Sequence, residues 1–333
     1  MTRLVAPDLL ESKVVETLIG AGLSSDKSRV VARVLVDADV RGHHSHGVEL
    51  LPTYLTRIAA GGIDVAAQLH WSGVGVVSIV DAAGGPGQIA MMAAVEHGID
   101  QAREYGAAVV GVRNNNHVGM LAAYRQPVAD AGMTALVLNI SGPSVAPPGG
   151  RRATLGNGAC CLISAVPGRD PFIADFATGV VALGKIRRLG ALGRPVPEGW
   201  LLDRNGEPST DAADLDSGGC VPVFGGHKGL CVALIVEVLA GILAGDTVSP
   251  LVNKQRQQPE RAMGCSQFVL VMDHAAFGVT DLAGLHDQLE DSVRHGYDSP
   301  PWLHYPEQFE RRNTERAGEG VQVSDAVLEV LSW

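Results

Sequence analysis

Residues 76–119, VVSIVDAAGGPGQIAMMAAVEHGIDQAREYGAAVVGVRNNNHVG, carry the clearest structural pattern in this sequence. Val76–Val80 is a β-branched run that leads into a turn-rich segment at 81–87, as a strand would. The stretch Gln88–Glu104 is predicted to be helical, and the apolar run Ala107–Val112 follows it. A strand, a helix and a second strand in this order predict an α/β core.

The same alternation continues along the chain. The first 60 residues are expected to be helical, because apolar residues recur there at helical spacing. Alternation by itself favours a parallel doubly wound sheet. A helix is predicted over Leu121–Ala131, and further strands are predicted at Thr134–Ile140, Cys160–Val166, Phe172–Phe176 and Gln267–Met272.

Three other stretches have distinct compositions. Residues 187–223 have few periodic apolar positions, which predicts a functional lid or a surface excursion. Residues 249–263 are rich in Gln and Arg and are expected to form an exposed loop. Leu230–Ala244 is the most apolar stretch, but it contains Glu237 and is shorter than the roughly 20 residues of a membrane span, so a buried helix is predicted.

The composition limits the class of protein. The chain has 333 residues, of which 46% are hydrophobic and 19% charged, as in globular enzymes. A formal net charge of −10 argues against a nucleic-acid partner. Five cysteines without CxxC spacing suggest free thiols in a reducing compartment. With no secretory signal in sight, the protein is expected to be cytoplasmic and not membrane-bound.

The segment Arg41–Gly47 contains three histidines within four positions. Metal binding is one interpretation, but His43, His44 and His46 lack the i, i+4 spacing of a zincin helix, and no matching carboxylate or cysteine accompanies them. Acid–base catalysis is the second, since imidazole exchanges protons near neutral pH. A polar helix exit with no chemical role is the third.

Two further motifs suggest a ligand site. Residues 114–119 place His117 directly after an apolar run, where open α/β sheets bind ligands, although Asn and Gly also suit a plain turn. Residues 225–229 place Lys228 at the start of an apolar helix, where free N–H groups favour anions. No GxGxxG fingerprint and no GxxxxGK[ST] loop is present, so a dinucleotide would have to be bound in another way.

Taken in order, a set of short motifs along nearly the whole chain resembles the malate/L-lactate dehydrogenase-like family. That family includes ureidoglycolate dehydrogenase, diketogulonate reductase, sulfolactate dehydrogenase and cyclic-imine carboxylate reductases. The matching segments are Asp39–Gly42, Ser45–Val48, Tyr54, Gly84–Gln88, Asn116–Gly119, Pro147–Gly150, Asp175–Thr178, Gly184–Ile186, Pro197–Trp200 and Gly226–Gly229.

The resemblance implies hydride transfer between NAD or NADP and a 2-oxo acid/2-hydroxy acid pair, or reduction of a cyclic imine or ketimine. It implies an α/β, non-Rossmann NAD(P)-binding fold with a mixed, largely antiparallel sheet and helical N- and C-terminal segments. A homodimer with its site near the subunit interface is expected. The implied division is a helical segment 1–70 packing with 300–333, a substrate-side region 71–120 and an NAD(P)-binding domain 121–299.

Site residues follow from the same resemblance. His46 is the favoured proton donor and Ser45 orients it, while His117 is the second acid–base candidate, and the choice between the two imidazoles stays open. No metal is expected. Cofactor contacts are expected from His117, Gly119, Ser141, Asp175, Phe176, Ala177, Thr178, Lys228 and Pro306, and substrate contacts from His46, Leu50, Tyr54, His117 and Lys228.

The chain departs from the family pattern at three places. Leu50 stands where an Arg commonly clamps the substrate carboxylate, which favours a less anionic or bulkier substrate. Gly156–Ala159 replaces Gly-Thr-Asn-Pro, and Pro306-Glu307 replaces Pro-Gly. These departures leave open a homologue that binds nucleotide or a partner without turnover. The cluster of His43, His44 and His46 leaves open a metal-dependent hydrolase or lyase.

Overall fold

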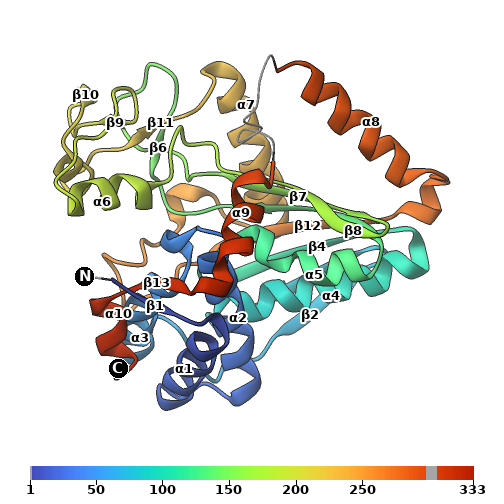
Figure 1. Ribbon diagram of the computed structural model, residues 1–333, viewed down its shortest axis with the longest axis horizontal. Coiled ribbons are helices and arrows are strands. Elements are labelled where there is room, and N and C mark those ends of the chain that lie inside the picture. Colours follow the sequence, from blue (N-terminus) through green and yellow to red (C-terminus); the bar gives the residue numbers. More distant parts are fainter. Residues whose placement is uncertain (1, 298–305) are drawn as a thin grey trace.

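The computed structural model describes residues 2–297 and 306–333. A large sheet with packed helices occupies one side of the molecule, and the two chain ends lie together in a helical cluster on the other side (Figure 1). Residues 300–305, which belong to the expected C-terminal segment, lie outside the described residues.

Seven strands form the large sheet in the order β2-β3-β4-β12-β5-β7-β8. Only β3 and β4 run parallel, so the parallel sheet favoured by the alternation is wrong and the mixed, largely antiparallel sheet is confirmed. The reason is β12, which lies between β4 and β5 and is antiparallel to both. The strands are β2 His70–Val74, β3 Val77–Asp81, β4 Ala107–Asn115, β5 Met133–Asn139, β7 Ala159–Val166, β8 Arg169–Phe176 and β12 Cys265–Asp273.

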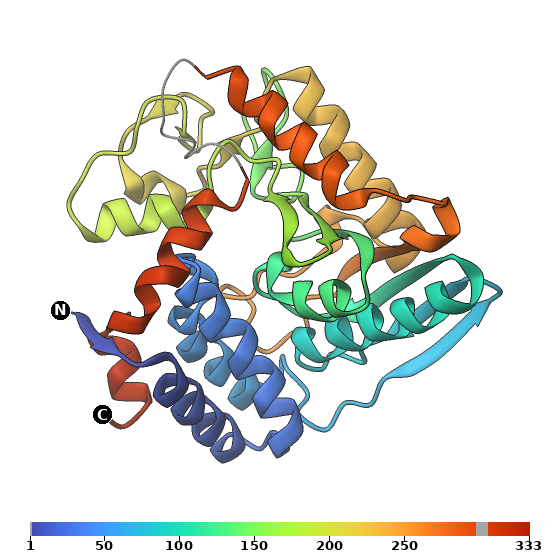
Figure 2. The same ribbon diagram turned by 45° about the vertical axis from the view of Figure 1, so that its right-hand side comes forward.

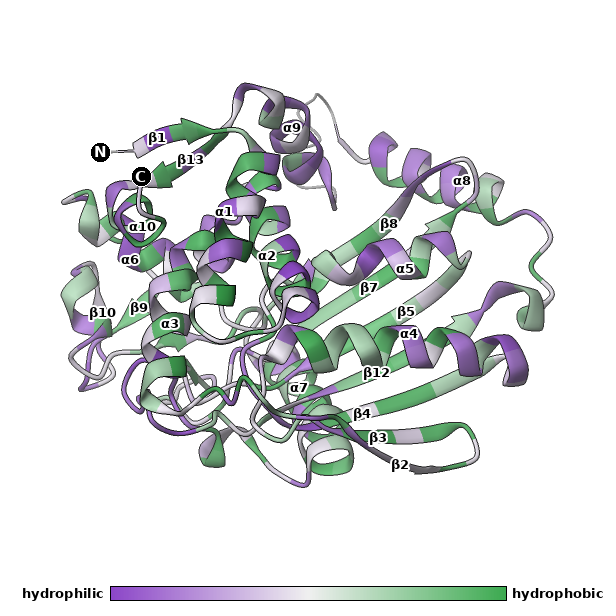
Figure 3. Cartoon of the chain, turned by 90° about the horizontal axis from the view of Figure 1, so that it is seen from below, coloured by the Kyte–Doolittle hydropathy of each residue, from purple (hydrophilic) through white to green (hydrophobic). Residues whose placement is uncertain are grey.

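Helix α4 (Gly87–Tyr105) packs on one face of the sheet through a stripe of small residues. Gly98 lies so close to the sheet that an added Cβ would be 2.9 Å from Val271 Cγ2. Gly106 ends the helix in the left-handed region, at φ 83°, as glycine commonly does. Helix α5 (Arg125–Asp130), preceded by the 3₁₀ turn η3 (Leu121–Tyr124), lies on the same side of the strands (Figure 3).

The opposite face of the sheet is covered by α7 (His227–Val236) and its π-helical continuation η5 (Glu237–Leu243). Val110 on β4 faces α4, whereas a Cβ added to the next residue, Gly111, would meet Ala244 at 3.0 Å. Successive residues of a strand point to opposite faces, so this second helical segment packs on the other side.

The prediction that Leu230–Ala244 forms a buried helix is wrong for the outer side of that helix. Ile235, Ile242 and Leu243 are each more than half exposed, at 55%, 53% and 63%. The sheet covers only one side of a segment that is apolar on every side. No helix in the described part of the chain has the length and apolarity to cross a bilayer.

The terminal cluster joins the two ends of the chain. Its strands β1 (Thr2–Val5) and β13 (Val321–Ser324) pair antiparallel. Its hydrophobic core combines Leu10 and Leu35 from the start of the chain with Val327 from the end. The N-terminal segment thus packs with the described part of the C-terminal segment, while the domain boundaries at 70, 120 and 299 stay predictions. Its helices are α1 Pro7–Gly20, α2 Ser25–Val40, α3 Leu51–Ala60 and α10 Asp325–Val330.

A small lobe contains the stretch that was expected to be a lid or surface excursion. Instead of an irregular loop, it has a hydrophobic core that includes Ile186, Val196 and Leu201. Its strands of two residues are too short to show periodicity. The lobe contains β6 Val145–Ala146, α6 Leu183–Ala191, β9 Leu201–Leu202, β10 Pro208–Ser209, η4 Ala212–Leu215 and β11 Val221–Pro222.

The remaining elements lie between and around these parts. The loop at 249–263 is exposed or half-buried over most of its length, but Ser249, Val252 and Met263 are buried. The other elements are η1 His44–His46, η2 Val48–Leu50, η6 Ser249–Leu251, η7 His274–Phe277, α8 Leu282–His295, α9 Gln308–Arg316 and η8 Ala317–Glu319.

Candidate active site

The histidine segment leaves the C-terminal end of α2 and is held by a buried carboxylate. Asp39 accepts hydrogen bonds from His44 Nδ1 at 2.8 Å and from the backbone N–H of Val48 at 2.7 Å. A Cβ on Gly47 would lie 2.2 Å from Asp39 Oδ2, so this close approach requires glycine. Asp39 therefore fixes the turn on both sides of His46.

His46 lies at the centre of this segment. Its Nδ1 is 3.3 Å from Ser45 Oγ, and its ring stacks on that of His117 with 5.9 Å between centroids and 20° between planes. Burial, reinforced by the nearby charge of His43, lowers the pKa of His46 to about 4. The imidazole is therefore neutral at neutral pH and can accept a proton.

His117 follows β4 on a loop that is fixed by amide side chains. Asn115 Nδ2 donates to Gln267 Oε1 at 2.7 Å. Asn116 Nδ2 donates to the carbonyl oxygens of Gly84 at 2.7 Å and Gly85 at 2.9 Å. The polar cluster at the strand end thus anchors the loop, and only His117 of this group lies in the site.

Tyr54 reaches His117 from α3. Its hydroxyl is 2.7 Å from His117 Nδ1 and accepts a hydrogen bond from Gln88 Nε2 at 2.9 Å. Tyr54 is 3% exposed, and burial raises the pKa of its phenol well above the usual range. Its hydroxyl is already committed to His117 and Gln88, which leaves it little freedom to contact a substrate directly. The expected substrate contact of Tyr54 stays a prediction.

Burial lowers the pKa of His117 to about 3, and the positive charges of Arg57 and Arg256, with that of His46 whenever it is protonated, add to this lowering. Both imidazoles are therefore neutral when the site is empty. Arg57 is fully buried and donates through Nη2 to Asn116 Oδ1 at 2.8 Å, while its Nε and Nη1 have no partner among the described residues. Arg57 has no signal in the sequence, because a lone Arg within a helix fits many roles. Gln88 falls in the matching segment Gly84–Gln88, but its contact with Tyr54 depends on the fold.

Ser45 is positioned by the family motif at the start of α6. A Cβ added to Gly184 would lie 2.3 Å from Ser45 Cβ, so the two backbones are in tight contact. The small lobe thus packs directly against the residue next to His46.

The candidate cofactor residues form a second group. Ser141 Oγ donates to Asn157 Oδ1 at 2.9 Å, and Thr178 Oγ1 donates to the Asn157 carbonyl at 2.9 Å. Asn157 therefore joins Ser141 to the Asp175–Thr178 segment, whose Phe176 meets Phe224 edge-on at 6.2 Å between ring centroids. Ala177 lies in the same segment and is half-buried.

Asp175 lies in the same segment; the residue is exposed, and its carboxylate takes part in a part-buried hydrogen bond. Its carboxylate accepts a hydrogen bond from the backbone N–H of Ala122 at 2.9 Å. Burial raises the pKa of Asp175 to about 6, although that hydrogen bond opposes the rise.

The other candidates are dispersed. Lys228 is exposed on the first turn of α7 and makes no ion pair with any described residue. Gly119 is buried, and its backbone N–H points to His117. Pro306 lines a small hollow with Arg169 on β8. Leu50 is 4% exposed within the core of the terminal cluster, so it offers a substrate little surface.

The three clustered histidines contact three different partners. His43 Nε2 is 2.8 Å from Glu310, His44 is bound to Asp39, and His46 faces Ser45. Among residues 2–297 and 306–333, no group of three His, Cys, Asp or Glu side chains is arranged to hold a metal ion.

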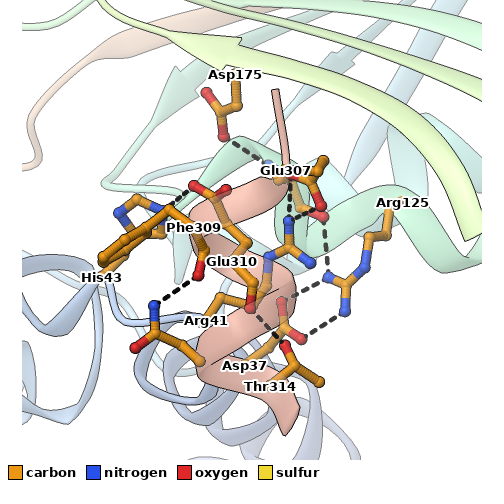
Figure 4. A network of polar contacts seen from close by, with 11 residues as sticks. Asp37, Arg41, His43, Arg125, Asp175, Glu307, Phe309, Glu310 and Thr314 are labelled. Carbon is orange, nitrogen blue, oxygen red and sulfur yellow. Dashed lines mark hydrogen bonds and ion pairs between the residues drawn. The ribbon is translucent and has the colours of Figure 1, made fainter. Parts of the chain in front are cut away.

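Helix α9 lies beside the end of α2, and side chains at its N-terminal end contact the histidine segment (Figures 2 and 4). Glu307 binds Arg41 through both carboxylate oxygens, and Glu310 binds His43. Arg125 of α5 forms a paired contact with Asp37 of α2, at 2.7 and 2.8 Å. The contacts of Glu307 and Glu310 could not be predicted, because they join residues more than 260 positions apart.

The model of the malate/L-lactate dehydrogenase family matches residues 5–332. The chain is similar to the malate dehydrogenase of Pyrococcus horikoshii, with 31% identity over 342 residues, 98% of this chain and 93% of that protein. It is 32% identical to the (2R)-3-sulfolactate dehydrogenase (NADP(+)) of Chromohalobacter salexigens over 277 residues, 83% of each chain.

A third relative is the Δ1-pyrroline-2-carboxylate/Δ1-piperideine-2-carboxylate reductase of Pseudomonas putida, which is 36% identical over 225 residues, 67% of this chain and 66% of that protein. Among solved structures, a dehydrogenase from Sinorhizobium meliloti superimposes with a TM-score of 0.91 and 28% identity. That superposition covers 100% of this chain and 98% of the other.

Proposed function

The chain belongs to the malate/L-lactate dehydrogenase family, and on that premise we propose that it transfers hydride between NAD(P) and a 2-oxo acid/2-hydroxy acid pair. The observation that carries this proposal is the stacked pair His46 and His117, in which two neutral imidazoles face one site. A hydroxyl proton needs such a base when hydride leaves the adjacent carbon.

His46 is proposed to hold the transferred proton. In the oxidation direction its neutral ring accepts the hydroxyl proton, and in reduction the protonated ring returns it to the substrate oxygen. Ser45 orients His46 through the contact at 3.3 Å, and Asp39 holds the surrounding turn. An anionic substrate raises the proton affinity of His46 when it binds, which brings the proton within reach for reduction.

NAD or NADP is proposed to bind along Ser141, Asp175–Thr178 and the start of α7, without a Rossmann fingerprint. Gly225 and Gly226, at φ 58° and 61°, leave open backbone next to Lys228, which suits a pyrophosphate. The exposed ring of Phe176 offers an apolar surface to a flat base. When bound, the nicotinamide supplies or accepts the hydride.

A cyclic imine carboxylate is the second candidate substrate, favoured by the likeness to the Pseudomonas putida reductase. Both substrate classes carry a carboxylate. With Leu50 in the core, the positive charge near His117 comes from Arg57 and Arg256. These two arginines are the candidates to attract that carboxylate in place of the missing family Arg.

The test is a panel of 2-oxo acids and cyclic imine carboxylates, each followed by nicotinamide absorbance with NADH and with NADPH. His46→Gln should remove most turnover and leave cofactor affinity near wild type. His70→Gln, at an exposed edge-strand position, is the matched control and should keep full activity. Turnover retained by His46→Gln would refute the role of His46.

We further propose that the protein is a homodimer through the outer side of α7 and η5. This surface begins at Leu234, six positions after Lys228 on the same helix, which would place the site near the interface. Ile242→Asp should shift the mass measured by light scattering from dimer to monomer and lower activity, whereas Leu9→Asp, on the exposed face of α1, should not. The apolar surface consists of Leu234, Ile235, Val238, Ile242 and Leu243, which are 45–63% exposed.

A further inference from the structure

His117 Nδ1 is surrounded by hydrogen-bond donors. The backbone N–H of Gly119 points at Nδ1 from 3.3 Å, and a backbone N–H can only donate. Tyr54 Oη lies 2.7 Å from the same atom. Because Gln88 Nε2 donates to Tyr54 Oη, the single phenol proton is left to point at His117. Two independent contacts therefore require a lone pair, and no proton, at Nδ1.

A neutral imidazole with a lone pair at Nδ1 carries its proton at Nε2. No described residue forms a hydrogen bond with His117 Nε2, and this atom is not among the fully covered polar atoms without a partner. His117 thus keeps an N–H donor that no described residue accepts, on the ring that stacks with His46.

We infer that Tyr54 and Gln88 are positioning residues that fix His117 in its Nε2–H form. His117 then donates a hydrogen bond to the substrate oxygen, while His46 alone transfers the proton. This inference rests on the proposed function for its chemistry, but the protonated nitrogen of His117 can be measured without turnover.

The proposed reduction step, with His46 as proton donor and His117 as hydrogen-bond donor, balances in atoms and charge. In reduction, hydride brings its electron pair to carbon and forms the C–H bond. The π pair of the carbonyl moves to oxygen and forms the O–H bond with the proton of the His46 imidazolium. His117 keeps its Nε2 proton throughout and stabilises the charge that develops on oxygen. Loss of that proton would leave an imidazolate, which the donors at Nδ1 could only partly stabilise.

Tyr54 and Gln88 are both buried, so side chains and not solvent set the direction of the Tyr54 hydroxyl proton. Tyr54 is 3% exposed and Gln88 is 1% exposed, so water does not compete for the Tyr54 hydroxyl. Gln88 itself lies on the first turn of α4, which the core holds rigidly. The orientation of the phenol proton is thereby set by the fold.

The direct test is nitrogen NMR of the histidine-labelled, ligand-free protein. The wild type should show His117 protonated at Nε2 and bare at Nδ1, and Tyr54→Phe should move His117 toward a mixture of the two forms. Tyr105→Phe, on an exposed tyrosine at the end of α4, is the matched control and should change nothing. A proton found at Nδ1 in the wild type would overturn the inference.

The kinetics of His117 variants distinguish a His117 that only donates a hydrogen bond from a His117 that transfers the proton. The amide nitrogen of a glutamine can stand near the position of Nε2, so His117→Gln should keep turnover within roughly tenfold of wild type, since one hydrogen bond is at stake. His117→Leu should lose more. If His117 transferred the proton, His117→Gln would instead fall by about 10²–10⁴-fold, like loss of a general base. The latter result would overturn the inference while leaving the proposed hydride transfer intact.

Absence of turnover in the wild type with both cofactors would refute the proposed function and not the tautomer. The nitrogen spectra of wild type and Tyr54→Phe would still decide the tautomer. Circular dichroism and melting temperature of each variant check that the fold is kept.

Discussion

Replacement of Glu307 tests how the C-terminal helix holds the histidine segment. The Arg41 and Glu307 side chains are 6% and 9% exposed, so removing the carboxylate leaves a buried guanidinium without its partner. Breaking such a pair costs about 3–5 kcal/mol. Glu307 also adopts φ 71°, where a residue other than glycine costs about 1 kcal/mol. Glu307→Ala should therefore lose about 3–5 kcal/mol, and Glu307→Gly about 1 kcal/mol less.

Thermal melting followed by circular dichroism measures both effects. At about 2.1 cal/mol/K per residue, a chain of 333 residues melts with an entropy of about 0.7 kcal/mol/K. Glu307→Ala should then melt about 4–7 °C below wild type, and Glu307→Gly about 1–2 °C above Glu307→Ala. Glu315→Ala, an exposed carboxylate on the same helix, should melt within about 1 °C of wild type.

Two outcomes would refute this reasoning. If Glu307→Ala melted with the wild type, the buried pair would carry none of the stability assigned to it. If the Ala and Gly variants melted together, the left-handed backbone would impose no cost. Arg41→Met combined with Glu307→Gly should recover most of the loss, because no unpaired charge is then left in the protein.

Three further predictions concern the site. Burial raises the pKa of Asp175 to about 6, so the folded state favours the protonated carboxyl. The stability that this gives is fully present below the pKa of the unfolded state and is lost as the pH rises through about 6. Asp175→Asn should thus melt higher than wild type near about pH 8 but not near about pH 4, and it should bind cofactor more weakly. Gly184→Ala should lower kcat at least about tenfold, because the new Cβ would displace Ser45, whereas Gly20→Ala, with open space around it, should not. Because burial lowers the pKa of His46 to about 4, kcat/KM for reduction should fall about tenfold per pH unit above neutrality, while oxidation stays level.

Each of these has a clear contrary result. A melting gain of Asp175→Asn that is equal at both pH values would show that ionisation of the carboxyl is not its source. Full activity of Gly184→Ala would show that contact with Ser45 does not position His46. A reduction rate independent of pH would show that the transferred proton does not come from a group of such low pKa.

Local patterns predicted the elements well where the sequence is periodic. Val76–Val80, Gln88–Glu104 and Ala107–Val112 correspond to β3, α4 and β4, because each has one buried and one less buried side. Their arrangement could not be derived in the same way. β12 enters the sheet from about 150 positions further on, and its pairing with β4 and β5 depends on long-range contacts that no local spacing encodes.

The site was predicted in part and for physical reasons that differ between residues. His46 and His117 stand in motifs with unusual composition, and the fold stacks their rings. Asp39 and Gln88 lie in segments that resemble the family, but no role was predicted for them, and Arg57 lies in none of these segments. All three act through hydrogen bonds to residues on other elements, which a single sequence does not show. The sequence also gives no means to assign different roles to the three clustered histidines, whereas in the fold they contact three different partners.

Hydride transfer that depends on His46 is tested most directly by following the transferred hydrogen in wild type and in His46→Gln. Wild-type protein is given a nicotinamide cofactor deuterated at its transferable position, together with each 2-oxo acid or cyclic imine carboxylate of the panel. We expect deuterium on the carbon next to the product carboxylate, and loss of most of that product with His46→Gln but not with His70→Gln. Deuterium that appears in solvent or in no product, or equal product from His46→Gln, would contradict it.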